Sequence, residues 1–204
     1  MLLREEMMVI AKHAGEAIMD VYENADDFEI TQKGDESPLT KADIAAHEVI
    51  VAGLQALDST PIVSEEGRVG DPMSSNTCWL VDPLDGTKEF IKRNGMFTVN
   101  IALMQRNGSR WKPLIGVVHA PASGTIWTGG TLVTTDRRGP EGSGPMMVQP
   151  SEGKVKLVAS GSHRGEMDES FAEAVGDHEL VRMGSSLKAC IVAEGSADLY
   201  PRFG

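Results

Sequence analysis

Apolar residues recur at helical spacing in two stretches near the N-terminus. Residues 2–22 predict an amphipathic first helix, and a second helix is expected from Thr40, with an apolar face that runs from Ile44 to Leu57. His47 lies on that second face, which favours a core or boundary histidine over a metal ligand. The stretch between the helices, residues 23–38, is polar and contains glycine, so it predicts a connection poor in strands.

Short apolar runs bounded by turn residues replace the helical spacing from Pro61 onward. They predict strands at residues 61–64, 79–82, 97–104, 113–119 and 125–128. Asn107-Gly108 lies between two of these strands and predicts a β-hairpin, with a loop slightly longer than the tightest turn.

The second half of the chain alternates strands and helices, as a small α/β domain does. Residues 135–153 hold a run rich in glycine and proline, which predicts a surface loop or linker. The elements expected after it are strands at 155–160, 179–183 and 197–203 and helices at 166–175 and 186–194. We therefore expect an N-terminal α+β domain at 1–134 and a partial C-terminal α/β domain at 154–204.

The composition is that of an ordinary globular protein, with 204 residues, 41% hydrophobic and 24% charged. A formal net charge of −11 leaves no basic excess for neutralising phosphates along a nucleic-acid polymer, so such a partner is not expected. Cys78 and Cys190 lie far apart in sequence and are expected to be buried thiols. Neither a signal-peptide pattern nor an apolar stretch of membrane-spanning length is present, so we expect a cytoplasmic protein.

Residues 79–87, Trp-Leu-Val-Asp-Pro-Leu-Asp-Gly-Thr, form the most informative segment. A short apolar run delivers Asp82 and Asp85 to a turn that Pro83 and Gly86 shape. At a separation of about 4 Å and an effective dielectric constant near 20, two carboxylates repel by roughly 4 kcal/mol unless a cation lies between them. Oxygen ligands without a nearby cysteine or histidine favour Mg²⁺ over zinc. An ordinary polar turn would explain Asp85-Gly86 alone.

A second strand ends in the same way. Residues 60–63 form a β-branched run that is followed by Ser64, Glu65 and Glu66. Two strands that each end in paired acids are hard to explain as solvated loops. Thr87 then begins a helical segment, Lys88–Arg93, whose free N–H groups suit a phosphate. Together these features indicate a metal-assisted phosphate site.

These residues resemble a known family. Ser64-Glu65-Glu66 followed by Trp79 to Thr87 is similar to the inositol monophosphatase superfamily of Mg²⁺-dependent, lithium-sensitive phosphatases. Lys88 to Gly95 and Gly184 to Lys188 resemble one branch, the CysQ-type 3′(2′),5′-bisphosphate nucleotidases of sulfur metabolism. The resemblance implies a layered αβαβα sandwich with an incomplete C-terminal part. It also implies removal of the 3′-phosphate of adenosine 3′,5′-bisphosphate, with 3′-phosphoadenylyl sulfate as a second substrate.

The resemblance assigns roles on the acidic side of the site. Two or three Mg²⁺ ions would be held by Glu65, Asp82, Asp85 and the main-chain oxygen of Leu84. Thr87 and Asp43 would activate the attacking water, assisted by Glu66. From its local sequence, Asp43 is equally explained by a capping box over Thr40 to Asp43 at the start of the second helix. Glu66 is equally explained as a solvated loop acid.

Substrate contacts are expected from Gly86, Thr87 and Lys88 and from the second half of the chain. Gly161 to Arg164 directly follows an expected strand, and ligands bind at the carboxyl ends of strands in α/β sheets. The resemblance matches His163, Ser185, Lys188 and Arg202 to the positions that bind a bisphosphate nucleotide. Taken singly, each is also explained as a helix cap, a loop donor or a surface charge.

The chain departs from the family pattern at its end. In the family a Trp-Asp motif follows within a few residues and supplies a further metal ligand, whereas this sequence stops at Gly204. We therefore expect a shortened form with weakened metal binding. Two alternatives stay open: an inositol monophosphatase or other sugar-phosphate phosphatase, and a catalytically weak nucleotide- or metal-binding module. A homodimer and peripheral association with the inner face of the membrane are further expectations.

Overall fold

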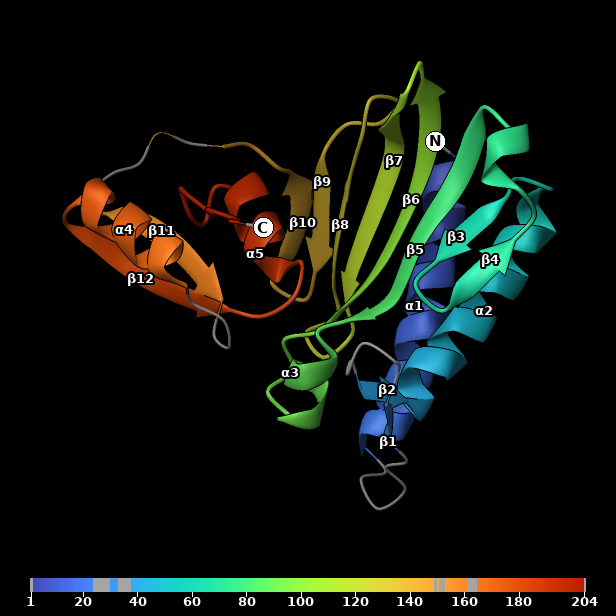
Figure 1. Ribbon diagram of the computed structural model, residues 1–204, viewed down its shortest axis with the longest axis horizontal. Helices are drawn as coiled ribbons and strands as arrows, with labels where there is room; N and C mark the ends of the chain where they lie inside the picture. The colour runs from blue at the N-terminus through green and yellow to red at the C-terminus, as the bar shows by residue number, and fades with distance from the viewer. Residues whose placement is uncertain are drawn as a thin grey trace.

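The computed structural model describes residues 2–23, 30–32, 38–148, 150, 153–160 and 165–203 (Figure 1). Helices α1 (Leu2–Glu23) and α2 (Lys41–Leu57) lie side by side against one face of a large sheet. A smaller α/β unit lies near the end of that sheet where residues 136–145 form its last two strands. No helix in the described ranges is both long and apolar enough to cross a membrane.

The two predicted helices are confirmed, and their apolar faces pack against the buried strand residues to form the main core. Met7, Ile10, Ala14 and Ile18 on α1 are buried, at the spacing that the sequence predicts. Gly15 lies on the same face, and a Cβ atom there would come 2.7 Å from the His119 ring. Because glycine has no Cβ, α1 can pack closely on the sheet.

The large sheet has the order β10-β9-β8-β7-β6-β5-β3-β4. All its neighbouring strands are antiparallel except β3 and β5, which run parallel. The strands are β3 (Ile62–Ser64), β4 (Gly67–Val69), β5 (Thr77–Asp85), β6 (Thr98–Asn107), β7 (Arg110–Ala120), β8 (Thr125–Gly129), β9 (Asp136–Gly139) and β10 (Gly142–Pro145). A separate antiparallel pair, β1 (Ile30–Gln32) and β2 (Pro38–Thr40), precedes α2. Short helical turns occur at η2 (Pro72–Ser74) and α3 (Thr87–Ile91).

Two predictions about the large sheet were wrong. Residues 135–153 are not simply a loop or linker, because β9 and β10 form a hairpin that extends the sheet. Glycine and proline hid this hairpin from sequence patterns. The β6–β7 hairpin is confirmed, but Asn107 pairs with Arg110, which leaves a two-residue loop tighter than expected. Backbone pairing continues through polar residues that periodicity does not detect.

The smaller unit contains the parallel pair β11 (Val155–Ser160) and β12 (His178–Met183), connected by α4 (Glu166–Val175). Helix α5 (Leu187–Ala193) follows β12. The expected strand at 197–203 is wrong: its described residues make only one parallel bridge, Leu199 with Leu157. Pro201 has no N–H to donate, which stops the ladder soon after that bridge.

An aromatic cluster anchors the segment that follows β5 to α1. Phe90 on α3 and Phe97 are fully buried, and their ring centroids are 5.2 Å apart. The Tyr22 ring at the end of α1 lies 5.0 Å from each of them. These contacts hold the turn that bears Asp82 to Thr87 against the core. Cys78 and Cys190 are buried free thiols, as predicted.

Candidate active site

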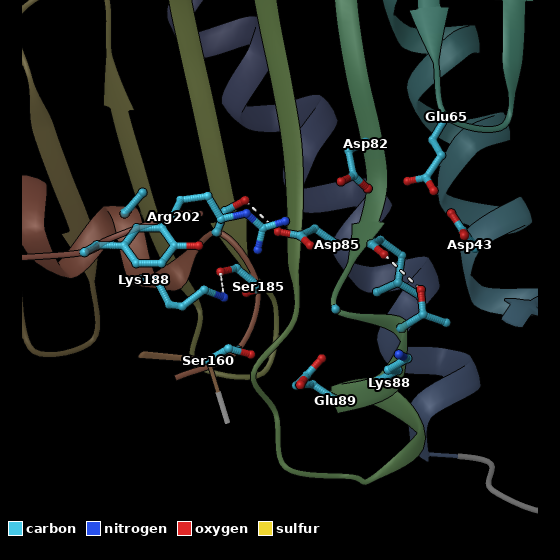
Figure 2. Close-up of a pocket in the computed structure, with 17 residues that line it drawn as sticks. Asp43, Glu65, Asp82, Asp85, Lys88, Glu89, Ser160, Ser185, Lys188 and Arg202 are labelled. Carbon is cyan, nitrogen blue, oxygen red and sulfur yellow. Dashed lines mark hydrogen bonds between the residues drawn. The ribbon is translucent and has the colours of Figure 1, made fainter. Parts of the chain in front are cut away.

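A cavity of about 460 Å³ opens between the carboxyl ends of β3 and β5 and the smaller unit (Figure 2). In this view Asp43, Glu65 and Asp82 lie on one side, Lys188 and Arg202 lie on the other with Asp85 between the two groups, and Lys88 and Glu89 lie below them. The acidic side consists of Asp43, Glu65, Asp82 and Asp85. The opposite side includes Ser160, Ser185, Lys188, Tyr200 and Arg202. The structure therefore brings together residues from both halves of the chain.

A β-bulge directs Asp82 and Asp85 into the same cavity. Asp82 pairs with Asn100 and Asp85 pairs with Thr98, so β5 advances three residues while β6 advances two. In a regular strand, residues three apart point to opposite faces. The extra residue of the bulge corrects this parity, and Pro83, which cannot donate to a ladder, lies within it.

The parallel pairing of β3 and β5 places Glu65 beside Asp82. Ser64 is in register with Val81, and the Glu65 N–H donates to the Val81 carbonyl over 3.2 Å. Because both strands run in the same direction, the acids at their carboxyl ends meet at one edge of the sheet. This arrangement explains why the sequence has a carboxylate at the end of each strand.

The carboxylates on the acidic side repel one another. Burial, followed by the charges of Asp85 and Glu65, raises the pKa of Asp82 from 3.8 to about 7. The buried Oδ1 atom of Asp82 has no hydrogen-bond partner in the structure. In the described part of the chain, no three His, Cys, Asp or Glu side chains are already arranged as a set of metal ligands. The type, charge and common cavity of the carboxylates on the acidic side fit a hard cation.

Thr87 and Asp43 lie where the second helix and the turn after β5 approach the cavity. The Thr87 hydroxyl donates to the Leu84 carbonyl over 3.3 Å, which ties two predicted site residues together. Asp43 is 4% exposed in the first turn of α2 and lines the cavity. The capping box proposed for this turn includes Thr40, whose side chain lies outside the described part, so that interpretation stays a prediction.

The basic side is organised around Lys188. This lysine is buried, and burial lowers its pKa, although the charges of Asp85 and Glu89 oppose that effect. Its ammonium group donates to the Ser185 carbonyl over 2.6 Å and lies 5.6 Å from the centre of the Tyr200 ring. Arg202 is exposed at the rim of the cavity and close enough to lower the pKa of Lys188. Two neighbouring cations are suited to an anionic ligand.

Two tight turns meet at the floor of the cavity. Gly86 has φ +97°, and a Cβ atom there would lie 2.9 Å from the Met96 carbonyl and 3.2 Å from the Ser185 Cβ. Ser185 itself has φ +47°, which is uncommon for a residue with a side chain. Such conformations persist only where surrounding contacts impose them, and they concentrate at functional sites.

The cavity includes most, but not all, of the predicted site residues. Glu66 is not among its lining residues, and His163 lies outside the described part of the chain. Sequence reasoning missed Glu89, Ser160 and Tyr200. Ser160 ends β11, so the rule that ligands bind at carboxyl ends of strands would have found it. Glu89 and Tyr200 offered no such signal.

The sequence matches the family model described as the inositol monophosphatase family over residues 3–204. The chain therefore belongs to the inositol monophosphatase family. Its layered arrangement of helices and sheets agrees with solved members. An IMPase of Thermotoga maritima superposes with a TM-score of 0.79 over 98% of this chain and 76% of that one; at 22% identity, this likeness shows the fold alone.

More similar relatives belong to one branch of that family. The chain is 43% identical to the 3′(2′),5′-bisphosphate nucleotidase CysQ of Escherichia coli O157:H7, over 98% of its length and 80% of the relative's. It is 36% identical to CysQ of Buchnera aphidicola, covering 98% of this chain and 75% of the relative. The crystal structure of CysQ from Bacteroides thetaiotaomicron superposes with a TM-score of 0.84 at 38% identity, covering 98% of this chain and 79% of that one. The expected resemblance is confirmed.

Proposed function

We propose that this protein is a Mg²⁺-dependent phosphatase that converts adenosine 3′,5′-bisphosphate into AMP and phosphate. The observation on which this rests is the division of charge across one cavity. Asp43, Glu65, Asp82 and Asp85 gather at the ends of β3 and β5, and Lys188 and Arg202 come from the smaller unit, while Lys88 and Glu89 also line the cavity. This division suits a substrate with two phosphates, one held through a cation and the other held directly. The same cavity would accept 3′-phosphoadenylyl sulfate, whose 5′ side also bears negative charge.

The acidic side is the proposed cation site. Glu65, Asp82 and Asp85 would provide carboxylate oxygens, and Leu84 would provide its carbonyl oxygen. The raised pKa of Asp82 and the absence of a partner for its Oδ1 atom support this assignment, because a cation would remove both unfavourable features. When bound there, Mg²⁺ would lower the pKa of a water molecule and neutralise charge on the phosphoryl oxygens.

The chain's own residues would orient the water and the substrate. The proposed path begins with a water oxygen attacking phosphorus, while Asp43 accepts a proton from that water. Thr87, held by its hydrogen bond to the Leu84 carbonyl, would orient the same water molecule. The bond between phosphorus and the 3′-oxygen breaks, and the 3′-oxygen takes up a proton from solvent. Phosphoryl transfer depends chiefly on positioning and electrostatics, so no protein nucleophile is required.

The second phosphate would lie against the basic side. Lys188 is buried and its position is set by the Ser185 carbonyl, whereas Arg202 lies at the rim. An arginine can bind a phosphate through two hydrogen bonds, and a lysine adds a compact charge. A monophosphate held at the cation site would leave these two residues unused.

The test compares two substrates on one protein preparation. Phosphate release is measured with Mg²⁺ from adenosine 3′,5′-bisphosphate and from inositol 1-phosphate, with an excess of chelator as the blank. We expect Mg²⁺-dependent release with a higher kcat/KM for the nucleotide. A preference for inositol 1-phosphate would instead favour an inositol monophosphatase. Phosphate release that is unaffected by the chelator would refute the cation site.

A further inference from the structure

One hydrogen bond crosses the cavity from the smaller unit to the acidic side. The Ser186 hydroxyl donates to Asp85 Oδ2 over 2.6 Å, although the two residues are 101 positions apart in sequence. Both residues line the cavity. A hydroxyl-to-carboxylate distance this short is typical of a strong, charge-assisted hydrogen bond.

The turn that bears Ser186 is held in place by its neighbours. Ser185 has φ +47°, and its carbonyl accepts from the buried Lys188 ammonium over 2.6 Å. The Ser185 hydroxyl also accepts from the Leu187 N–H over 3.3 Å. The Cβ of Ser185 lies close to Gly86, so the turn packs against the loop that follows Asp85. The position of Ser186 is therefore set by contacts on both sides.

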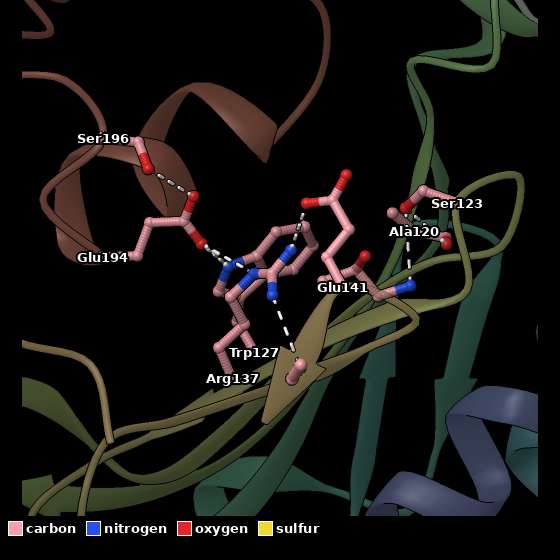
Figure 3. Close-up of polar contacts among 9 residues, drawn as sticks. Ala120, Ser123, Trp127, Arg137, Glu141, Glu194 and Ser196 are labelled. Atoms are coloured by element: carbon pink, nitrogen blue, oxygen red, sulfur yellow. Dashed lines mark hydrogen bonds and ion pairs between the residues drawn. The ribbon is translucent and has the colours of Figure 1, made fainter. Parts of the chain in front are cut away.

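The far end of α5 is attached independently to the large sheet (Figure 3). Glu194, directly after α5, accepts from the Trp127 indole N–H over 2.6 Å and pairs with Arg137 over 3.2 Å. Trp127 lies on β8 and Arg137 on β9. Since α5 spans only Leu187–Ala193, these contacts limit how far its first turn can move. Ser186 thus reaches Asp85 from a helix that is held at both ends.

We propose that Ser186 is a positioning residue for the cation site: it orients the Asp85 carboxylate so that Oδ1 points toward the ion. This inference rests on the proposed function, because it requires Asp85 to be a cation ligand. Without the hydrogen bond, the carboxylate would rotate more freely, and fixing its orientation when an ion binds would then cost free energy. Partners that orient metal ligands typically contribute about 10–100-fold to metal affinity.

The sequence supports a specific role for the hydroxyl. Ser185 and Ser186 are adjacent, but they do different things: Ser185 supports the turn, whereas only Ser186 reaches the acidic side. Ser196 offers a matched comparison, because its hydroxyl donates to a carboxylate of Glu194 over 2.8 Å at an exposed position outside the cavity. Removing either hydroxyl deletes one serine-to-carboxylate hydrogen bond.

The test measures Mg²⁺ affinity directly by isothermal titration calorimetry, without substrate, in the unmodified protein and in S186A, S186C, S186T and S196A. We expect S186A to bind Mg²⁺ about 10–100-fold more weakly. S186C should also bind more weakly, because a thiol is a poor donor of nearly the same size. S186T should restore the affinity, and S196A should match the unmodified protein. Circular dichroism of each variant checks that it is folded. If S186A does not fold, the comparison is made with S186C.

Kinetics provide the second measurement. If Ser186 acts through the cation, S186A should need more Mg²⁺ for half-maximal rate, while KM for the nucleotide at saturating Mg²⁺ stays within about twofold. Unchanged Mg²⁺ affinity in folded S186A or S186C would overturn the inference, and so would a loss that S186T does not restore. An unmodified protein that binds no Mg²⁺ would overturn both this inference and the proposed function. A protein that binds Mg²⁺ but does not hydrolyse the nucleotide would refute the function alone, and the affinities would still decide the role of Ser186.

Discussion

Replacing Asp82 by asparagine should stabilise the metal-free protein at neutral and alkaline pH. The reason is the pKa of Asp82, which burial and the nearby Asp85 and Glu65 raise from 3.8 to about 7. Asparagine has a similar shape and no charge, so it keeps the packing and removes the repulsion. The charge of such a carboxylate favours binding of a cation, but it lowers the stability of the metal-free folded protein.

The sign of the pH dependence follows from proton binding. Below about pH 4 the Asp82 carboxyl is protonated in both the folded and the unfolded chain. Between about pH 4 and pH 7 the unfolded chain has lost this proton while the folded protein retains it, so stability falls as the pH rises. A shift of about 3 pKa units corresponds to about 4 kcal/mol of unfolding free energy, fully expressed above pH 7.

Urea unfolding in the presence of a chelator, followed by tryptophan fluorescence, measures this effect at pH 5 and pH 8. The unfolding free energy of Asp82→Asn should be higher than that of the unmodified protein by up to about 4 kcal/mol at pH 8. At pH 5 the difference should be clearly smaller. Added Mg²⁺ should stabilise the unmodified protein and have little effect on the variant. Glu48→Gln, an exposed acid on α2, is the control and should show no such pH-dependent difference. If the unfolding free energies of Asp82→Asn and the unmodified protein differ by the same amount at both pH values, the pKa of Asp82 is not raised in the folded protein.

Three further outcomes are expected. Lys188→Ala should raise KM for adenosine 3′,5′-bisphosphate at least tenfold more than for a monophosphate, because a lost charged contact costs on the order of 2–5 kcal/mol when its partner stays buried. The control is Lys112→Ala, which replaces an exposed lysine on β7. Equal increases in KM for both substrates would contradict the two-phosphate model. Burial lowers the pKa of His119 from 6.5, so the unfolded chain takes up a proton at this site before the folded protein does, and stability should fall as the pH drops below about 6.5. His119→Gln should flatten the dependence of the unfolding free energy on pH in that range. An unchanged dependence would show that His119 is not responsible. Glu194→Ala removes the acceptor of Trp127 and Arg137 and should lower the unfolding free energy by about 1–3 kcal/mol, whereas the exposed Glu141→Ala should change it by less than about 0.5 kcal/mol; similar losses in both would argue against a specific role for Glu194.

Local spacing was sufficient to predict that Glu65, Asp82 and Asp85 lie together, and the structure places all three in one cavity. The apolar runs before Ser64 and Asp82 predicted strands, and the acids after them predicted a cation site, because both signals lie within a few neighbouring residues. The two helices near the N-terminus were equally predictable from the sequence, since their buried residues recur at a regular spacing. Even the basic residues Lys188 and Arg202 were identified, although by resemblance to a family and not by any periodic pattern.

Other features required contacts between distant segments. The extra residue that brings Asp82 and Asp85 to one face is visible only in their pairing with β6. The β9–β10 hairpin was hidden because its glycine- and proline-rich strands resemble a loop, and its pairing with β8 comes from tertiary packing. Ser186 reaches Asp85 because α5 is anchored at both ends by residues from elsewhere in the chain. A one-dimensional pattern shows which residues can bind an ion, but their distance and orientation arise only when the two halves pack together.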